Sequence, residues 1–292
     1  MGDFAKPCHE LEQCIDSNEG DLIHSINSIT LHKPSCNEMK KSFPDSIIES
    51  PRGELIQTLN LDGDHHMALD VLLFEKLVAK SNFSIAARFY KWNGNWLSLG
   101  RNQKEIPPKW LELARLNKLK LVRRPSGGGA VLHSGGLTYS LFWESPPKKK
   151  REAYFKASEW LLESFSSLGL SLKFGDETAG RICKNCFSTA TGGDLIDGNG
   201  QKRVGNAQYW KKGKLLQHGE IILTPPENLW RDVFETDPPQ KSIVNFNAFQ
   251  LEQSLVKSLK RSWPKTNWEE RSLTNEELNE VRSKAKDYLI RN

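Results

Sequence analysis

The sequence has no long apolar run. None of its hydrophobic stretches approaches the roughly 20 residues that a helix needs to cross a bilayer, so we expect no membrane-spanning segment. The first 50 residues contain no arginine and several acidic residues. They therefore lack the basic start of a signal peptide and the Arg-rich, acid-poor composition of a transit peptide. The expected location is the cytoplasm.

Cysteines are few and odd in number. The five thiols, Cys8, Cys14, Cys36, Cys183 and Cys186, are spread thinly over 292 residues, which is unlike the dense, even set of a disulfide framework. Free thiols in a reducing compartment fit this pattern better. The pair at 183 and 186 has no second Cys-x-x-Cys and no paired histidines to complete a zinc site, so we predict no metal.

An excess of charge of one sign is also absent. The formal net charge is +5, too small for this length to indicate nucleic acid as a partner. The densest basic run, Lys148–Arg151, has no interleaved aromatic residues. It is either a solvated loop or a patch that steers an acidic protein partner. We expect neither nucleic acid nor a membrane as a partner.

The residue patterns that are present predict an α+β fold, with a mixed and largely antiparallel sheet flanked by helices. Residues 1–50 show weak periodicity, and we expect them to form a mobile N-terminal extension. Residues 51–240 combine strand-like and helical segments and are predicted to form the main domain. Residues 241–292 are predicted to form a small C-terminal helical appendage.

Three local patterns predict finer detail. The residues Asn93-Gly94-Asn95 separate two strand-like runs and supply the turn chemistry of a β-hairpin. Ala153–Leu168 has the apolar stripe of one amphipathic helix. In the C-terminal segment, the spacing of Thr274 and Glu277 is typical of a capping box that opens a helix.

The first candidate site segment runs from Arg123 to His133 and contains three consecutive glycines. Each glycine costs about 1 kcal/mol of conformational free energy relative to alanine, so some feature of the site must require them. Glycines permit close backbone approach and present N–H groups to an anion or a carbonyl, with two guanidinium groups beside them. The candidate substrate-binding residues here are Arg123, Arg124, Ser126, Gly127, Gly128, Gly129 and His133.

A second candidate segment surrounds Lys202 on a predicted strand. A lysine followed three residues later by Gly205 can project inward while the glycine leaves room for a ligand. A further histidine, His218, lies on the next predicted strand. The candidates of this segment and its neighbour are Lys202, Gly205, Asn206, Ala207 and His218.

In this order the segments resemble the biotin/lipoate protein ligase superfamily. Its lipoate branch carries RRxSGGGAVxH, then GxKxxGxAQ, then a Q/H-HG turn, which here are Arg123–His133, Gly200–Gln208 and Gln217–Gly219. The resemblance covers roughly residues 52–290. It implies a mixed sheet flanked by helices, with the acyl-transfer catalytic domain over residues 51–240. It also implies attachment of an octanoyl or lipoyl group to a specific lysine of a partner protein, with Lys202 at the acyl carbonyl.

Two mechanisms share this scaffold, and Cys186 bears on the choice between them. Octanoyltransferases take octanoyl from acyl carrier protein through a cysteine thioester. Cys186-Phe187 resembles the nucleophile-bearing Cys-Phe of octanoyltransferases of the LipM type. This favours an acyltransferase with Cys186 and Lys202 as catalytic residues and no cofactor. The implied donor is octanoyl-acyl carrier protein, and the implied acceptors are lipoyl domains of 2-oxoacid dehydrogenase complexes or the glycine cleavage H protein.

Two alternatives stay open. In an ATP-dependent lipoate-protein ligase, ATP and Mg would serve as cofactors, and Arg123, Arg124 and the glycines would hold the phosphate of a lipoyl-adenylate. A non-catalytic acyl-binding protein of the same fold is the other. The sequence does not specify the acyl donor, the acceptor or the oligomeric state.

Overall fold

Eight strands of the described chain form one sheet. The computed structural model describes residues 50–291 apart from 81, 176–190 and 242–245, and these residues belong to one unit, Glu49–Asn292. β1 is parallel to both of its neighbours and the other described pairs are antiparallel, which confirms the predicted mixed, largely antiparallel sheet. In spatial order the strands are β11 (Asn267–Arg271), β1 (Arg52–Leu61), β2 (Ile85–Trp92), β6 (Gly136–Trp143), β10 (Lys214–Ile222), β9 (Lys202–Lys211), β8 (Leu195–Ile196) and β7 (Lys173–Phe174).

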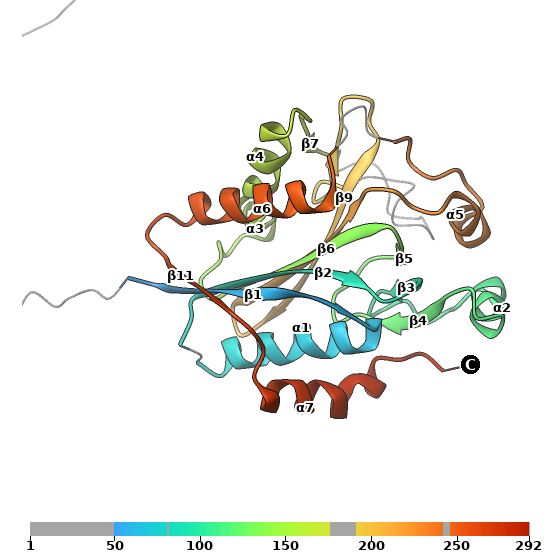
Figure 1. The fold of residues 1–292 in the computed structure, drawn as a ribbon, viewed down its shortest axis with the longest axis horizontal. Helices are drawn as coiled ribbons and strands as arrows, with labels where there is room; N and C mark the ends of the chain where they lie inside the picture. Colours follow the sequence, from blue (N-terminus) through green and yellow to red (C-terminus); the bar gives the residue numbers. More distant parts are fainter. Residues whose placement is uncertain (1–49, 81, 176–190, 242–245, 292) are drawn as a thin grey trace, which may run out of the picture. The chain divides into compact units, whose positions relative to one another are not determined.

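Helices cover both faces of this sheet. Figure 1 shows α1 (Gly63–Val78) and α7 (Asn275–Lys284) below it and α3 (Lys150–Lys156), α4 (Glu159–Ser167) and α6 (Ala248–Ser262) above it. Alternation along the strands supplies an apolar face to each layer. Phe142 and Leu216 pack with α1, whereas Leu141 and Leu215, their neighbours in sequence, pack with α4 and α6.

A second, three-stranded sheet lies beside the first and carries part of the candidate site. Its order is β4 (Lys120–Arg123), β3 (Trp96–Leu99) and β5 (Val131–His133). Its apolar residues pack against α2 (Pro108–Arg115) and α5 (Glu227–Phe234). The glycine run joins β4 to β5, so both ends of the run are held by one small sheet.

Two local predictions are wrong. The strands on either side of Gly94 do not form a hairpin, because β2 pairs with β1 and β6 whereas β3 pairs with β4 and β5. The predicted helix Ala153–Leu168 is divided into α3 and α4 by a break at Ala157-Ser158. At this break the Gln217 side chain donates to the carbonyl of Ala157 and to the hydroxyl of Ser158.

The C-terminal segment contains the predicted capping box and an unpredicted strand. Thr274 and Glu277 bond reciprocally at the start of α7, as their spacing predicts. Between α6 and α7, β11 adds to the large sheet alongside β1. Its sequence is polar and mostly exposed, which explains why no strand pattern was visible. None of the described helices is long and apolar enough to cross a membrane.

Candidate active site

A buried cavity of about 30 Å³ lies where α1 and the two sheets meet. Side chains alternate along a strand, so His218 and Glu220 of β10 share one face. Leu216 is on the same face and packs in the cluster that α1 covers, which identifies this as the α1 side. The lining brings together five of the residues that the sequence marked as candidates: Arg124, His133, Gly205, Ala207 and His218.

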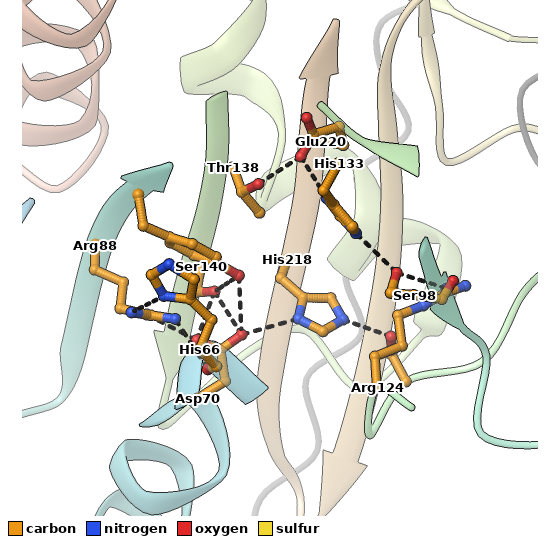
Figure 2. Close-up of polar contacts among 12 residues, drawn as sticks. His66, Asp70, Arg88, Ser98, Arg124, His133, Thr138, Ser140, His218 and Glu220 are labelled. Atoms are coloured by element: carbon orange, nitrogen blue, oxygen red, sulfur yellow. Dashed lines mark hydrogen bonds and ion pairs between the residues drawn. The ribbon is translucent and has the colours of Figure 1, made fainter. Parts of the chain in front are cut away.

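His218 connects a carboxylate to a hydroxyl. Its Nδ1 lies 3.0 Å from Oδ2 of Asp70 (Figure 2), and its Nε2 lies 2.5 Å from Oγ of Ser126. An ionised carboxylate only accepts hydrogen bonds, so Nδ1 donates to Asp70 and leaves Nε2 to the Ser126 hydroxyl. This is the order of groups in Ser–His–Asp sites, where the carboxylate holds the imidazole in the tautomer of a base.

Asp70 is fully buried, and its neighbours keep it charged. Arg88 Nε donates to its Oδ1 at 2.8 Å, Tyr90 donates to its Oδ2 at 3.2 Å, and the Ser140 hydroxyl lies within 2.9 Å of both oxygens. Burial alone would raise the pKa of Asp70, but Arg88, His218 and Ser140 outweigh it and lower the pKa to about 2. Asp70 is therefore a permanent acceptor for His218 near neutral pH.

A second histidine–carboxylate pair lies on the same cavity. His133 Nδ1 lies 2.7 Å from Oε2 of Glu220, its Nε2 lies 2.8 Å from Oγ of Ser98, and its ring stacks on Trp92 with centroids 3.9 Å apart. The Thr138 hydroxyl donates to the same oxygen of Glu220. Burial lowers the pKa of His133 below its ordinary value despite the opposing effect of Glu220. Burial thus favours the neutral form of this ring near pH 7.

Arg124 holds the glycine run in place. Its Nη2 donates to the carbonyls of Gly127 and Gly129, both at 2.7 Å, and its Nη1 donates to the carbonyl of Ser98 at 2.9 Å. The sequence suggested that the N–H groups of the run face a ligand. The carbonyls of Gly127 and Gly129 face a buried guanidinium of the protein itself.

The positions of the glycine run differ in whether they require glycine. Gly128 has a φ of +92°, in the region that favours glycine, whereas Gly127 has no such angle and open space where a side chain would be. The carbonyl oxygen of Gly128 lies only 1.9 Å from the position that a Cβ of Gly100 would occupy. Close backbone approach therefore requires glycine at position 100, which follows β3.

Two candidate cations, Arg123 and Lys202, bond to protein groups away from the cavity lining. Arg123 Nη1 donates to the carbonyls of Gly100 and Gln103 at 2.9 and 2.7 Å. The ammonium of Lys202 donates to Oδ2 of Asp194 at 2.8 Å, in an ion pair with both side chains buried. Among the described residues, neither Arg123 nor Lys202 lines the cavity.

The small residues of β9 shape the cavity. Gly205 pairs with Glu220 and Ala207 pairs with His218, and neither β9 residue has a large side chain to fill the space opposite. Asn206 lies between them and points to the other face, where its side chain bonds to protein groups. It supports the strand from behind the cavity.

The proposed nucleophile Cys186 lies in residues 176–190, outside the part of the chain that the structure describes. Its proposed role rests on the Cys-Phe resemblance in the sequence.

Several residues of the two histidine networks were not among the predicted site residues: Asp70, Arg88, Ser98, Thr138, Ser140 and Glu220. The sequence does contain a pattern that could have identified them. Arg88 stands between the apolar Ala87 and Phe89 of a buried strand, and Thr138 and Ser140 alternate with apolar residues in β6. Polar residues that recur on the helix-covered face of an apolar strand indicate a buried polar network.

The chain matches a known protein family. The model of the lipoyl protein ligase A/B catalytic domain matches residues 62–275, and the chain belongs to this family. Among the curated relatives is octanoyltransferase LipM of Oceanobacillus iheyensis, 35% identical over 179 residues, which are 60% of this chain. The match spans 65% of that relative's length.

Solved structures of similar fold are lipoate protein ligases. Lipoate-protein ligase A bound with ATP superposes with a TM-score of 0.67 at 19% identity, covering 81% of this chain and 94% of that one. The bipartite lipoate protein ligase from Thermoplasma acidophilum, described with its E2 lipoyl domain, has a TM-score of 0.62 at 16% identity and covers 81% and 92%. At these identities the likeness concerns the fold alone.

Proposed function

We propose that this protein transfers an octanoyl group from octanoyl-acyl carrier protein to the specific lysine of lipoyl domains. One observation carries the proposal: segments that match the motifs of the family meet at one buried cavity, in a chain whose curated relatives include octanoyltransferases. The acceptors would be lipoyl domains of 2-oxoacid dehydrogenase complexes or the glycine cleavage H protein. We place this activity in the cytoplasm and assign it no cofactor.

The proposed reaction has two halves. In the first, the Cys186 thiolate attacks the carbonyl carbon of the carrier thioester, a new C–S bond forms, and the carrier leaves as a thiolate that takes up a proton. A free thiol is only a few per cent ionised at neutral pH, so Cys186 needs a positive neighbour to lower its pKa. Lys202 is the proposed cation, and it also stabilises the oxyanion. In the second half the acceptor lysine displaces Cys186 and becomes an amide.

ATP-dependent ligation is the alternative that the experiment must separate. A ligase would make lipoyl-adenylate from the free acid with ATP and Mg, and its arginines would hold the phosphate. Arg124 lies on the cavity, but its Nη1 and Nη2 already donate to the carbonyls of Ser98, Gly127 and Gly129.

To test this, the protein and a lipoyl domain are incubated either with octanoyl-acyl carrier protein or with octanoate, ATP and Mg. The mass of the lipoyl domain is then measured. With octanoyl-acyl carrier protein alone, the acceptor should gain one octanoyl group. If it gains this mass only with octanoate, ATP and Mg, the transferase proposal fails and ligation replaces it. Acyl binding without modification from either donor would indicate the non-catalytic protein.

A matched pair of variants tests the nucleophile. In the absence of acceptor, wild-type protein should form an octanoyl adduct that intact-mass measurement detects. Cys186→Ser should lose the adduct, whereas Cys183→Ser, three residues earlier, should keep it. An unchanged adduct in Cys186→Ser would remove Cys186 from the mechanism.

A further inference from the structure

A second, larger cavity adjoins the first. Its volume is about 400 Å³, within the range of ligand sites, and it shares Trp92, His133 and Glu220 with the lining of the inner cavity. His133 and Glu220 thus line both cavities, and below the larger one is called the outer cavity and the smaller one the inner cavity. Of the charged side chains on the outer lining, Lys91 is exposed and Glu220 is buried.

The two carboxylate oxygens of Glu220 differ. Oε2 accepts from both Thr138 and His133 (Figure 2), whereas no side chain or backbone group of the described residues bonds to Oε1. Oε1 lies 2.0 Å from the position that a Cβ of Gly136 would occupy, and Gly136 lines the outer cavity. The residue is only 4% exposed. Oε1 is thus a carboxylate oxygen that keeps its acceptor capacity for a donor group in the outer cavity.

We propose that the acceptor lysine enters through the outer cavity, that its ammonium donates to Oε1 of Glu220, and that Glu220 takes its proton. This inference rests on the proposed acyl transfer. Lysine is almost entirely protonated at neutral pH, and only the neutral amine attacks a carbonyl, so the site needs a base at the point of entry. His133 and Thr138 hold the carboxylate through its other oxygen and are positioning residues.

One proton passes from the ammonium to Oε1 of Glu220 and is later released to solvent through the outer cavity. The amine nitrogen then forms a bond to the acyl carbonyl carbon, and the bond from that carbon to the thioester sulfur breaks. The sulfur leaves as a thiolate and takes the second proton from the nitrogen, which leaves a neutral amide and a free thiol.

A binding cycle tests the contact without any chemistry. The dissociation constant is measured for wild-type protein and Glu220→Gln, each with a lipoyl domain and with the same domain carrying glutamine in place of its acceptor lysine. If the ammonium bonds to Glu220, each single change weakens binding about 10-fold and the double change is no worse than one alone. Equal weakening of both acceptors by Glu220→Gln, or no weakening, overturns the proposal.

A kinetic comparison tests the proton transfer. Acyl-enzyme is formed first, and its decay is followed with a lipoyl domain or with methoxyamine, an amine that is already neutral at pH 7. Glu220→Gln should slow transfer to lysine about 10²-fold or more while leaving methoxyamine within about twofold, because a neutral amine needs no base. A parallel fall for both amines would indicate a structural role and overturn the proposal.

The controls keep the two proposals distinguishable. Glu276→Gln, an exposed site on α7, should match wild type in every arm. If Glu220→Gln does not fold, Glu220→Asp keeps the charge at a shorter reach and should show intermediate selectivity for lysine. Failure of the wild-type protein to form an acyl-enzyme contradicts the proposed thioester, whereas the binding cycle still decides the role of Glu220.

Discussion

His218 donates its Nδ1 proton to Asp70 at 3.0 Å, although 148 residues separate the two in the chain. The bond joins α1 to β10 and fixes the orientation of a histidine that lines the inner cavity. Arg88 pairs with the same carboxylate. Asp70 therefore stabilises the fold and also orients His218.

We expect Asp70→Asn to destabilise the protein by about 3–5 kcal/mol, because it leaves the buried Arg88 guanidinium without its counter-charge. Urea unfolding measures the change. The exposed Glu276→Gln should stay within about 0.5 kcal/mol of wild type. A loss below about 1 kcal/mol for Asp70→Asn would show that Arg88 finds another partner.

The pH dependence of stability should report the same carboxylate. The pKa of Asp70 is lowered from 3.8 to about 2 on folding, so its stabilisation is complete above about pH 4 and is lost as the pH falls through 2. The free energy of unfolding should fall by about 2–3 kcal/mol as this stabilisation is lost. Asp70→Asn should therefore have a flatter stability profile than wild type in this acid range, measured by urea midpoints. Parallel profiles would contradict the assignment.

Two glycines should respond differently to alanine. Gly100→Ala should destabilise by about 1–3 kcal/mol, because its Cβ would meet the backbone of Gly128, which cannot move as a side chain would. Gly127→Ala, in open space without a left-handed φ, should be within about 0.5 kcal/mol of wild type. Thermal or urea unfolding of the pair separates close approach from a general need for flexibility. Equal losses would contradict this distinction.

Lys202→Met should cost about 3 kcal/mol of stability, since it leaves the buried Asp194 without its cation. The cost is at the low end because Asp194 still accepts from Thr191 and from the backbone of Asn206. Adding Asp194→Asn should recover part of the stability without recovering acyl transfer. Recovery of both, measured by unfolding and acceptor mass, would show that Lys202 acts only through structure.

Ser126→Ala should still form the octanoyl adduct if Cys186 is the nucleophile, although Ser126 has the geometry of a serine beside a histidine base. Removing its hydroxyl leaves Nε2 of His218 without a donor and should cost about 1–3 kcal/mol. Intact-mass measurement without acceptor is the readout. Loss of the adduct in Ser126→Ala but not in Cys186→Ser would move the acyl group to the serine.

The contact partners of two adjacent residues could not be predicted from the sequence. Arg123 and Arg124 belong to one motif, yet Arg124 lines the cavity and Arg123 bonds to the loop after β3. Gly94 has the positive φ of a turn glycine, as its sequence context predicts, but the strands before and after it belong to different sheets. A motif or a turn residue specifies local backbone, whereas its partners are set by segments far away in the chain.

The sequence by itself determined the α+β class and the family, because alternation, helical periodicity and the order of three motifs are local properties that the chain displays directly. Tertiary structure decided which of those residues share a cavity. It paired Asp70 with His218 and Glu220 with His133, and it directed the ammonium of Lys202 to Asp194. These pairings depend on strand register and on helix placement across the sheet, which arise only when distant segments pack together.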